Sequence, residues 1–332
     1  MCPAAILGDR ASGKTTFLGA LYSTLVETGS GPNDDFRFFA GPDALRFMSS
    51  VRETMLLGAF PAATLKEQVT QVEFTFGFRT IWKKIGLDTE SRLFKPWKGI
   101  KFGAYDVSGE DVQEYIESGV ASGPIIKQLL ESNIVVILVD CGRMTLDRDS
   151  PSYRDMLHYD SDVARLIVNF ATYKIEEARH RAAAGRTGAP SVIFPAIVLT
   201  KTDQIRGETL HELGLPLAIP EGHDRAGRQA FCEGLLRSFL PQTLAQLRGG
   251  KVAGVSFDRA EYFACWIKTV TSDGGMTPVG KARISLTGPG AGHGAMMDYS
   301  RDEYLEFIDY FRRIAKQVAD VEAEDEKELA AS

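Results

Sequence analysis

The segment Gly8-Asp9-Arg10-Ala11-Ser12-Gly13-Lys14-Thr15 constrains the fold of this chain more than any other feature of the sequence. It directly follows a short apolar run, Ala4 to Leu7, that predicts a buried strand. Lys14 opens a pattern of apolar residues at helical spacing that continues to about Glu27. A strand, a glycine-bounded loop and a helix in this order place backbone amides and a helix N-terminus around a phosphate group. The sequence therefore predicts a phosphate-binding loop of the P-loop type within an α/β fold.

Each residue type in this loop has a chemical role. Lys14 is expected to reach the outer phosphates of a nucleotide, and the Thr15 hydroxyl is expected to ligate Mg2+. Glycines at the two ends let the backbone wrap closely around the phosphates. The residues expected to line the bound phosphates are Gly8, Asp9, Arg10, Ala11, Ser12, Gly13, Lys14, Thr15 and Thr16.

Beyond the loop, strand and helix patterns alternate along the chain. Such alternation predicts a three-layer α/β fold of the P-loop NTPase class, with a mostly parallel central sheet covered by helices. One strand is expected to be antiparallel, because the predicted strands at 69–80 and 100–107 form a hairpin with an enlarged loop. The other predicted strands lie at 134–139, 192–199 and 262–270, and the strand at 262–270 is expected to be the last of the chain. The predicted helices lie at 42–57, 112–130, 161–184, 226–247 and 301–321.

The domain organisation follows from the length of the segments between these elements. A single domain is predicted over residues 1–319, with insertions near 29–60, 80–99, 141–190 and 274–297. Seven glycines lie between Gly274 and Gly294, so a long loop is expected there. Residues 320–332 are expected to form an acidic tail.

Composition excludes several classes of protein. A net charge of −6 argues against a general nucleic-acid-binding protein, which needs a basic excess to neutralise phosphates. The four cysteines are far apart and the five histidines are scattered, so neither set has metal-ligand spacing. No apolar run approaches the roughly 20 residues of a membrane-spanning helix, and the first residues lead straight into the loop without room for a signal peptide. We therefore expect a cytoplasmic protein.

A second motif, Asp106-Val107-Ser108-Gly109, stands at the end of the strand predicted at 100–107. An aspartate there can hold Mg2+ through a water molecule, and the amide of the glycine can contact a terminal phosphate. On its own this pattern is weak, because turns often contain Asp and Gly. Its position after a predicted strand favours the functional interpretation.

A third motif, Thr200-Lys201-Thr202-Asp203, follows the strand predicted at 192–199. The Asp203 carboxylate can accept hydrogen bonds from both N1 and N2 of guanine, whereas adenine offers no such pair of donors. The stem of Lys201 can pack along the base. The alternative is an exposed strand end followed by an ordinary turn.

Together, these three motifs resemble the first, third and fourth motifs of Ras-like GTPases in the translation-factor-related P-loop class. Thr200 stands where that family more often has Asn, a variant also found in Rho-type GTPases, and the base-reading Asp203 is retained. For the fifth motif, the resemblance implies Thr271-Ser272-Asp273, which could contact the guanine oxygen through a backbone amide.

The second motif of the family is a single threonine that contacts Mg2+ and the terminal phosphate. Thr64 is preferred to Thr70, because Thr70 lies inside a strand pattern. The arrangement Gly58-x-x-Pro61-x-x-Thr64, the helix before it and the large insertions are similar to the bacterial double-GTPase group, whose members often occur with conflict or signalling systems. The resemblance implies the following sites: Thr15, Thr64 and Asp106 for Mg2+; Lys14, Thr64, Gly109, Glu110 and Arg10 for catalysis; Thr200, Lys201, Asp203, Thr271 and Ser272 for the nucleotide base.

Two residues depart from the Ras-like pattern. Glu110 stands where a Gln usually orients the attacking water, and a carboxylate there repels the γ-phosphate, so slow unaided hydrolysis is expected. Glu110 could instead simply begin the following helix. Arg10 stands where the family often has Gly, and it either points to solvent or neutralises charge on the γ-phosphate.

The insertion at 79–101 is basic, with three large aromatic residues interleaved. This composition suits a peripheral contact with an anionic membrane surface, an acidic partner or nucleic acid. A solvated hairpin whose aromatic residues pack on the body of the protein is the favoured explanation.

The leading hypothesis is a Mg2+-dependent molecular switch that binds GTP and GDP, hydrolyses GTP and is read by an effector or activating protein. A scaffold that binds guanine nucleotide without hydrolysing it is the alternative, and Glu110 favours it. A P-loop ATPase or kinase is a third hypothesis, against which Asp203 argues. No specific nucleic-acid partner is expected, and the sequence does not define an oligomeric state.

Overall fold

The four-stranded parallel sheet at the centre of the molecule brings the ends of its strands to one edge. A computed structural model describes residues 4–9, 12–28, 36–62, 70–78, 98–106, 109–119, 132, 134–183, 192–220, 224–248, 251–252, 255–257, 260–270, 282–287, 296–311 and 313–314. The strands run in the order β1, β5, β6 and β9, and in their register Asp140 lies opposite Thr200 and Leu199 opposite Ala264. Their bounds are Ala4–Leu7 for β1, Ile134–Asp140 for β5, Val192–Thr200 for β6 and Glu261–Ala264 for β9.

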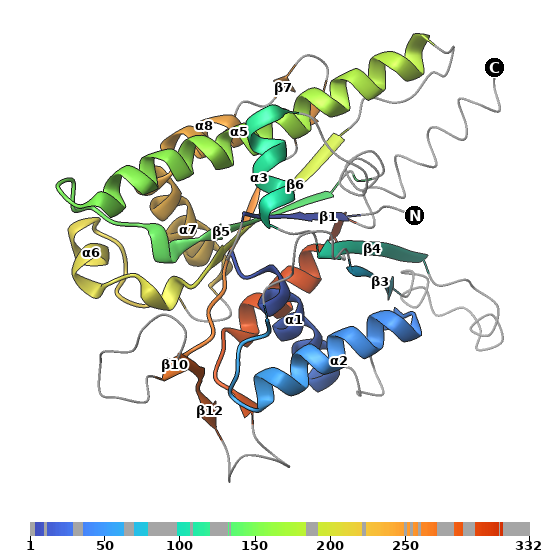
Figure 1. The fold of residues 1–332 in the computed structure, drawn as a ribbon, viewed down its shortest axis with the longest axis horizontal. Helices are drawn as coiled ribbons and strands as arrows, with labels where there is room; N and C mark the ends of the chain where they lie inside the picture. Colours follow the sequence, from blue (N-terminus) through green and yellow to red (C-terminus); the bar gives the residue numbers. More distant parts are fainter. Residues whose placement is uncertain are drawn as a thin grey trace, which may run out of the picture.

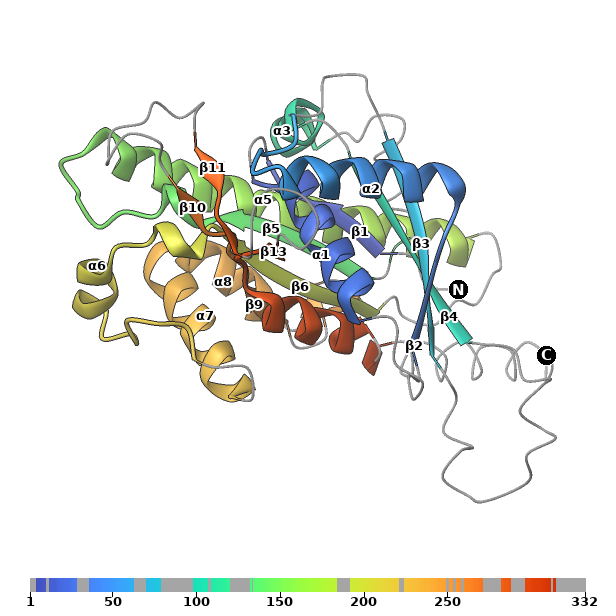
Figure 2. The same ribbon diagram turned by 90° about the horizontal axis from the view of Figure 1, so that it is seen from below.

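A second, antiparallel sheet extends the first on the side of β1. It contains β2 (Phe36–Ala40), β3 (Thr70–Phe78) and β4 (Lys98–Asp106), and β4 lies beside β1 (Figure 2). The predicted hairpin of β3 and β4 is confirmed. Strand β2 was not predicted, because five residues inside an expected insertion carry too short a pattern to stand out.

Helices cover both faces of the parallel sheet, which confirms the predicted three-layer α/β class (Figure 1). One face carries α1 (Lys14–Thr28), α2 (Pro42–Leu56) and the C-terminal helix over residues 301–311. The other face carries α3 (Gly109–Ser118), α5 (Pro151–Ala183), α7 (Arg225–Phe239) and α8 (Pro241–Arg248). None of the described helices combines the length and apolar composition needed to cross a bilayer.

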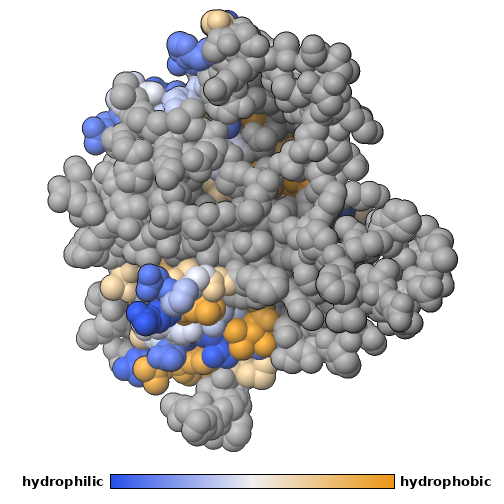
Figure 3. Space-filling model, turned by 90° about the vertical axis from the view of Figure 1, so that its right-hand side faces the viewer, coloured by the Kyte–Doolittle hydropathy of each residue, from blue (hydrophilic) through white to orange (hydrophobic). Residues whose placement is uncertain are grey.

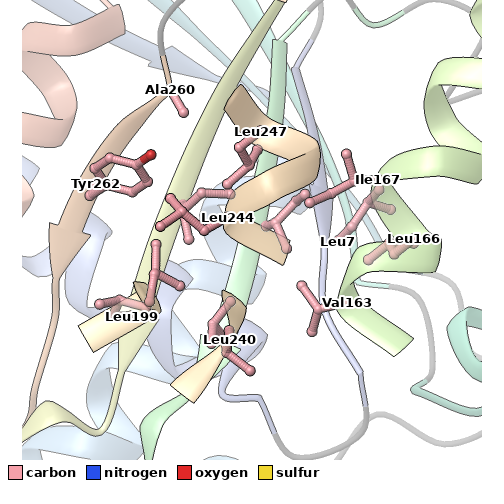
Figure 4. Close-up of a cluster of buried hydrophobic side chains, with 14 of the residues drawn as sticks. Leu7, Val163, Leu166, Ile167, Leu199, Leu240, Leu244, Leu247, Ala260 and Tyr262 are labelled. Carbon is pink, nitrogen blue, oxygen red and sulfur yellow. The ribbon is translucent and has the colours of Figure 1, made fainter. Parts of the chain in front are cut away.

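The alternation of side chains along the strands divides the core into two halves. In β5, Val136 and Leu138 pack against α1, α2 and the C-terminal helix, whereas Val135 and Ile137 face the helices on the opposite side. Figure 4 shows part of this second half, where Leu7 of β1 and Leu199 of β6 lie near Leu244 of α8. Adjacent residues of a buried strand point to opposite faces, so an uninterrupted apolar run serves both halves.

Helices α1 and α2 pack unusually closely at Gly19. A Cβ atom built at that position would lie 2.6 Å from the Sδ of Met55 and 2.6 Å from Cγ1 of Val51. Both neighbours are buried side chains of α2. Glycine is therefore required at this crossing, because any side chain would force the helices apart.

Figure 3 shows the face of the molecule seen from the right of Figure 1, where hydrophilic and hydrophobic side chains are mixed over the described surface.

Several predicted boundaries were wrong, and prolines explain two of the differences. Helix α5 begins at Pro151 rather than near 161, and a break at Leu240 divides the helix predicted at 226–247 into α7 and α8, with Pro241 first in α8. Proline is favourable at the first position of a helix, where its missing N–H costs nothing. The Asp160 carboxylate of α5 accepts hydrogen bonds from the amides of Gln242 and Thr243, at 3.0 and 2.9 Å, and thereby caps α8.

The strand predicted at 262–270 is shorter than expected, and it is not the last strand of the chain as predicted. Strand β9 ends at Ala264, and four short strands follow it, two of them inside the segment expected to be a glycine-rich loop. The bounds of the remaining short elements are Lys251–Val252 for β7, Val255–Phe257 for β8, Thr269–Val270 for β10, Arg283–Ile284 for β11, Leu286–Thr287 for β12, Met296–Met297 for β13, Gly207–Glu212 for α6, Cys141–Arg143 for the 3-10 helix η3 and Thr202–Gln204 for η4. The second half of the helix predicted at 112–130, the end of the helix predicted at 301–321, the acidic tail and most of the basic insertion lie outside the described residues.

A buried ion pair joins α7 to the C-terminal helix. The Nε atom of Arg228 lies 2.6 Å from a carboxylate oxygen of Glu303, and the two side chains are only 3% and 5% exposed. The other Glu303 oxygen accepts a hydrogen bond from the Ala264 amide, so this carboxylate also holds the end of β9. Burial raises the pKa of Glu303 to about 7, although the Ala264 amide and Arg228 both oppose the rise.

We expect Arg228→Met to lower the free energy of unfolding by about 3–5 kcal/mol at pH 8, since Glu303 is left charged and unpaired in the core. The loss should be smaller at pH 6. The raised pKa of the folded state means that Glu303 binds its proton there while the unfolded chain does not, and protonation favours the folded state. Urea unfolding at the two pH values measures both effects. Arg237→Met, on an exposed site of the same helix, is the matched control and should change stability by less than about 0.5 kcal/mol. Equal losses in both variants would contradict the prediction.

Candidate functional site

The predicted phosphate-binding loop connects β1 to α1, as the motif requires. Gly8 is close-packed, because a Cβ atom there would lie 2.5 Å from the Ser12 hydroxyl oxygen and 3.2 Å from Leu138. Gly13 has a φ of +86°, a backbone conformation that residues other than glycine rarely adopt. Both glycines of the motif are thus required by the shape of the loop. Arg10 and Ala11, between them, lie outside the described residues.

Lys14 holds this loop in a closed curve. Its Nζ atom donates hydrogen bonds to the backbone oxygens of Gly8 and Asp9, at 2.7 and 2.9 Å. The Ser12 hydroxyl donates to the same Asp9 oxygen at 3.0 Å. Lys14 is only 8% exposed, so its positive charge is concentrated inside the loop. An anion that enters the loop meets this ammonium group together with the N-terminus of α1.

Thr200, at the end of β6, ties the third motif to this loop. Its hydroxyl lies 2.9 Å from the backbone oxygen of Ser12 and 3.2 Å from that of Val139, so its single proton is shared between these two acceptors, with Ser12 the nearer. Thr200 is buried. The threonine found in place of the more common asparagine therefore makes a direct contact between the two motifs, and the short β-branched side chain is suited to a rigid position.

The residues after Thr200 form a tight turn. Lys201 is the one non-glycine residue of positive φ in the described part of the chain, with a φ of 56°. Thr202 donates through both its amide and its hydroxyl to the backbone oxygen of Cys265, which follows β9. Asp203 lies in η4 and is exposed. Backbone strain held in place by neighbouring contacts is a common property of binding sites.

A cluster of charged residues lies between the two motifs. The Lys201 ammonium lies 2.6 Å from a carboxylate oxygen of Asp140, the last residue of β5. Arg143 of η3 lies 2.7 Å from a carboxylate oxygen of Asp9 in the phosphate-binding loop. Burial raises the pKa of Asp9 to about 6, and the charges of Arg143 and Lys14 limit the rise. Asp140 and Arg143 were missed by sequence reasoning, although a single aspartate at the end of the apolar run 134–139 was a signal.

The residues predicted for Mg2+ are described only in part. Thr15 stands in the first turn of α1, and Asp106 is the last residue of β4, the strand beside β1. The backbone therefore places both on elements that start or end next to the loop, an arrangement that fits one hydroxyl ligand and one carboxylate held through water. Among the described residues, no group of three His, Cys, Asp or Glu side chains could hold a metal by itself.

The remaining predicted residues are placed as follows. Gly109 and Glu110 are the first two residues of α3, which agrees with the interpretation of Glu110 as a helix-starting acid and leaves its catalytic role as a prediction. Thr64, Thr271 and Ser272 lie outside the described residues. Thr271 also lies beyond β10, and the residue that directly follows β9 and contacts the third motif is Cys265.

Comparisons with known proteins add little to this geometry. No protein-family model matches the chain, and no curated protein matches it. Among solved structures, the chain is similar to one described as the signal recognition particle receptor SRb-GTP/SRX complex from Chaetomium thermophilum. The TM-score is 0.34 at 12% sequence identity, over 80% of this chain and 90% of that chain.

Proposed function

We propose that this protein binds GTP and GDP with Mg2+, hydrolyses GTP slowly and acts as a molecular switch. The observation that carries the proposal is the hydrogen bond from the Thr200 hydroxyl to the backbone oxygen of Ser12, at 2.9 Å. It joins a loop with the chemistry of a phosphate site to a turn with the chemistry of a base-reading site. A nucleotide has phosphates at one end and a base at the other, so one ligand can occupy both.

On the phosphate side, the residues from Gly8 to Thr16 form the site. Lys14 supplies a buried positive charge, and the backbone of the loop and the first turn of α1 supply amide donors. The lysine holds the loop carbonyls, so the loop keeps its curve before any phosphate arrives. Such preorganisation lowers the cost of ordering the site on binding.

On the base side, Asp203 selects guanine. Its exposed carboxylate can accept hydrogen bonds from N1 and N2 of the base, and an adenine in the same position would leave the carboxylate without donors. The ion pair of Lys201 with Asp140 fixes the lysine stem, which then packs along the base. Thr271 and Ser272 complete the base contacts in this proposal.

Mg2+ is proposed to sit between Thr15, Thr64, Asp106 and the phosphates. When bound, it neutralises charge that develops on the phosphates during hydrolysis. Thr15 and Asp106 fit this role by their positions at the start of α1 and the end of β4. Thr64 would then be ordered by the γ-phosphate and released after hydrolysis, as in other nucleotide switches.

Hydrolysis is proposed to be slow without a partner. Lys14, Thr64 and the Gly109 amide stabilise the γ-phosphate, and Arg10 either contributes a second positive charge or points to solvent. Glu110 cannot donate a hydrogen bond to the phosphoryl oxygen when ionised, and its charge repels the phosphate. The position of Glu110 as the second residue of α3 also supports the alternative, a guanine-nucleotide-binding scaffold without turnover.

The wider role is proposed from the same features. The nucleotide state is read by a protein effector or activator through the insertions of a single domain over 1–319, and the basic segment at 79–101 touches an anionic membrane surface or partner. A bacterial signalling or conflict system is the proposed setting, by resemblance to the double-GTPase group.

The deciding experiment measures which nucleotide binds and whether it is hydrolysed. The nucleotide that copurifies with the protein is identified by chromatography, and dissociation constants for GDP, GTP, ADP and ATP are measured by calorimetry. Guanine nucleotides should bind at least about 100-fold more tightly than adenine nucleotides, and single-turnover hydrolysis of GTP should be slow and require Mg2+. Equal binding of ATP and GTP would contradict base selection, whereas tight GTP binding without turnover would select the scaffold.

A further inference from the structure

Four charged side chains of alternating sign form a chain that runs from the phosphate-binding loop to the base-reading turn. They are Asp9, Arg143, Asp140 and Lys201, and we call them the charge chain. Arg143 lies 2.7 Å from Asp9 and 4.0 Å from Asp140, and Lys201 lies 2.6 Å from the same Asp140 oxygen. Asp9 and Asp140 have only 11% and 5% of their side chains exposed, whereas Arg143 and Lys201 are 38% and 34% exposed, so water screens the carboxylates less than the cations.

Arg143 is the central link of this chain, and its own position is fixed. Its guanidinium lies over the ring of Tyr159 in α5, 4.7 Å from the ring centroid. The Tyr159 hydroxyl in turn accepts a hydrogen bond from the Asp140 amide at 2.7 Å. Arg143 is therefore held by the buried ring of Tyr159, which is itself anchored to the end of β5. In this position the planar guanidinium can interact with the carboxylates of both Asp9 and Asp140.

Arg143 offsets the negative charge that Asp9 places inside the phosphate-binding loop. An acidic residue inside a loop that receives phosphate repels its ligand, and Asp9 is largely buried. The charged groups around it are Arg143, Lys14, Asp140 and Lys201. Lys14 bonds the backbone oxygen of Asp9 rather than its carboxylate. The other carboxylate oxygen, Oδ1, is buried without a hydrogen-bond partner among the described residues, so Arg143 is the main group that directs this carboxylate.

We propose that Arg143 is a positioning residue of the nucleotide site, which draws the Asp9 carboxylate away from the phosphates and, through Asp140, holds Lys201 in place beside the base. The inference rests on the proposed function, because it assigns a role in binding a guanine nucleotide. It goes beyond that function by adding Arg143 and Asp140, which lie outside the five motifs, and by explaining how an acid is tolerated in the second position of the loop.

The test removes the positive charge of Arg143 in one variant, and both this charge and the Asp9 carboxylate in a second variant. Arg143→Gln keeps a stem to pack on Tyr159 but loses the positive charge, and GDP affinity should fall about 10- to 100-fold. Arg148→Gln is the matched control, since Arg148 is an exposed arginine five residues further along the chain. The double variant Asp9→Asn/Arg143→Gln should bind GDP about tenfold more tightly than Arg143→Gln alone, because the repelling carboxylate is gone. Calorimetry with GDP and Mg2+ measures all four proteins, and circular dichroism checks that each is folded.

Each outcome decides between the two proposals. Failure of the unmodified protein to bind GDP would overturn the proposed function and, with it, this inference. If that protein binds GDP and Arg143→Gln matches Arg148→Gln, the inference alone is overturned. If Arg143→Gln weakens binding but the double variant shows no recovery, Arg143 acts through packing on Tyr159 rather than by directing Asp9, and the inference is again overturned. Recovery in the double variant shows that the Asp9 carboxylate opposes nucleotide binding once Arg143 is lost, as the inference requires.

Discussion

Replacing Lys14 by methionine is expected to weaken the binding of GTP and GDP by about 100-fold or more. Methionine has nearly the same length and keeps the packing of the stem, but it removes the positive charge inside the loop. The loss combines the charge-assisted hydrogen bonds to the phosphates, each about 1.5–3 kcal/mol, with the ordering of the loop by the bonds from Lys14 to Gly8 and Asp9. A tenfold change in affinity corresponds to about 1.4 kcal/mol, so the loss of two charge-assisted hydrogen bonds to the phosphates is enough for a 100-fold effect.

Calorimetric titration with GDP and GTP in the presence of Mg2+ measures this effect. Arg46→Met is a suitable control, because it removes one positive charge from α2 at a side chain that is 82% exposed. The control should bind both nucleotides as the unmodified protein does. Unchanged binding by a folded Lys14→Met protein would show that the phosphates do not lie in this loop.

Asp203→Asn is expected to invert the preference of the protein between guanine and xanthine nucleotides. Guanine presents two donors, N1–H and the N2 amino group, and a carboxylate accepts both. Xanthine keeps N1–H but carries a carbonyl oxygen at the neighbouring position, which matches the oxygen and the NH2 group of an asparagine amide. We expect GDP affinity to fall at least about 100-fold and XDP affinity to rise by a similar factor, because each mismatch leaves a polar group unpaired.

The ratio of the dissociation constants for GDP and XDP is the quantity to measure. It is insensitive to a general loss of folded protein, since both constants come from the same sample. Glu208→Gln in α6 is the control, as it removes one exposed acid near the same turn without touching the predicted base contacts. A ratio that stays the same in Asp203→Asn would remove Asp203 from the base site.

The parts of the fold that sequence alone could predict are those determined by neighbouring residues. The order of β1, loop and α1 follows from a short apolar run, two glycines and Lys14, all within about ten positions. Strand β4 ends at Asp106 and β6 at Thr200, each within one residue of the end that the apolar patterns predicted. Pro151 and Pro241 were local signals as well, and they mark the helix starts that were missed.

The parts that could not be predicted depend on contacts between distant segments. The pairing of β2 with β3 brings together residues about 40 positions apart, and such pairing leaves no local pattern. The salt bridge between Asp9 and Arg143 spans more than 100 positions, and either residue alone resembles an ordinary surface charge. The end of β9 at Ala264 is set by the hydrogen bonds from the Cys265 amide to Leu199 and from the Ala264 amide to Glu303, rather than by its own sequence.

The close approach of α1 and α2 at Gly19 has a mechanical consequence. Met55 and Val51 of α2 are packed against a residue of α1 that has no side chain, so a displacement of α1 is transmitted to α2 at this contact. The first turn of α1 belongs to the phosphate-binding loop, and α2 ends at Leu56, a few residues before Thr64. Met55 directly precedes Leu56, the last residue of α2, so a shift of α1 at Gly19 would displace the end of α2 that leads toward Thr64.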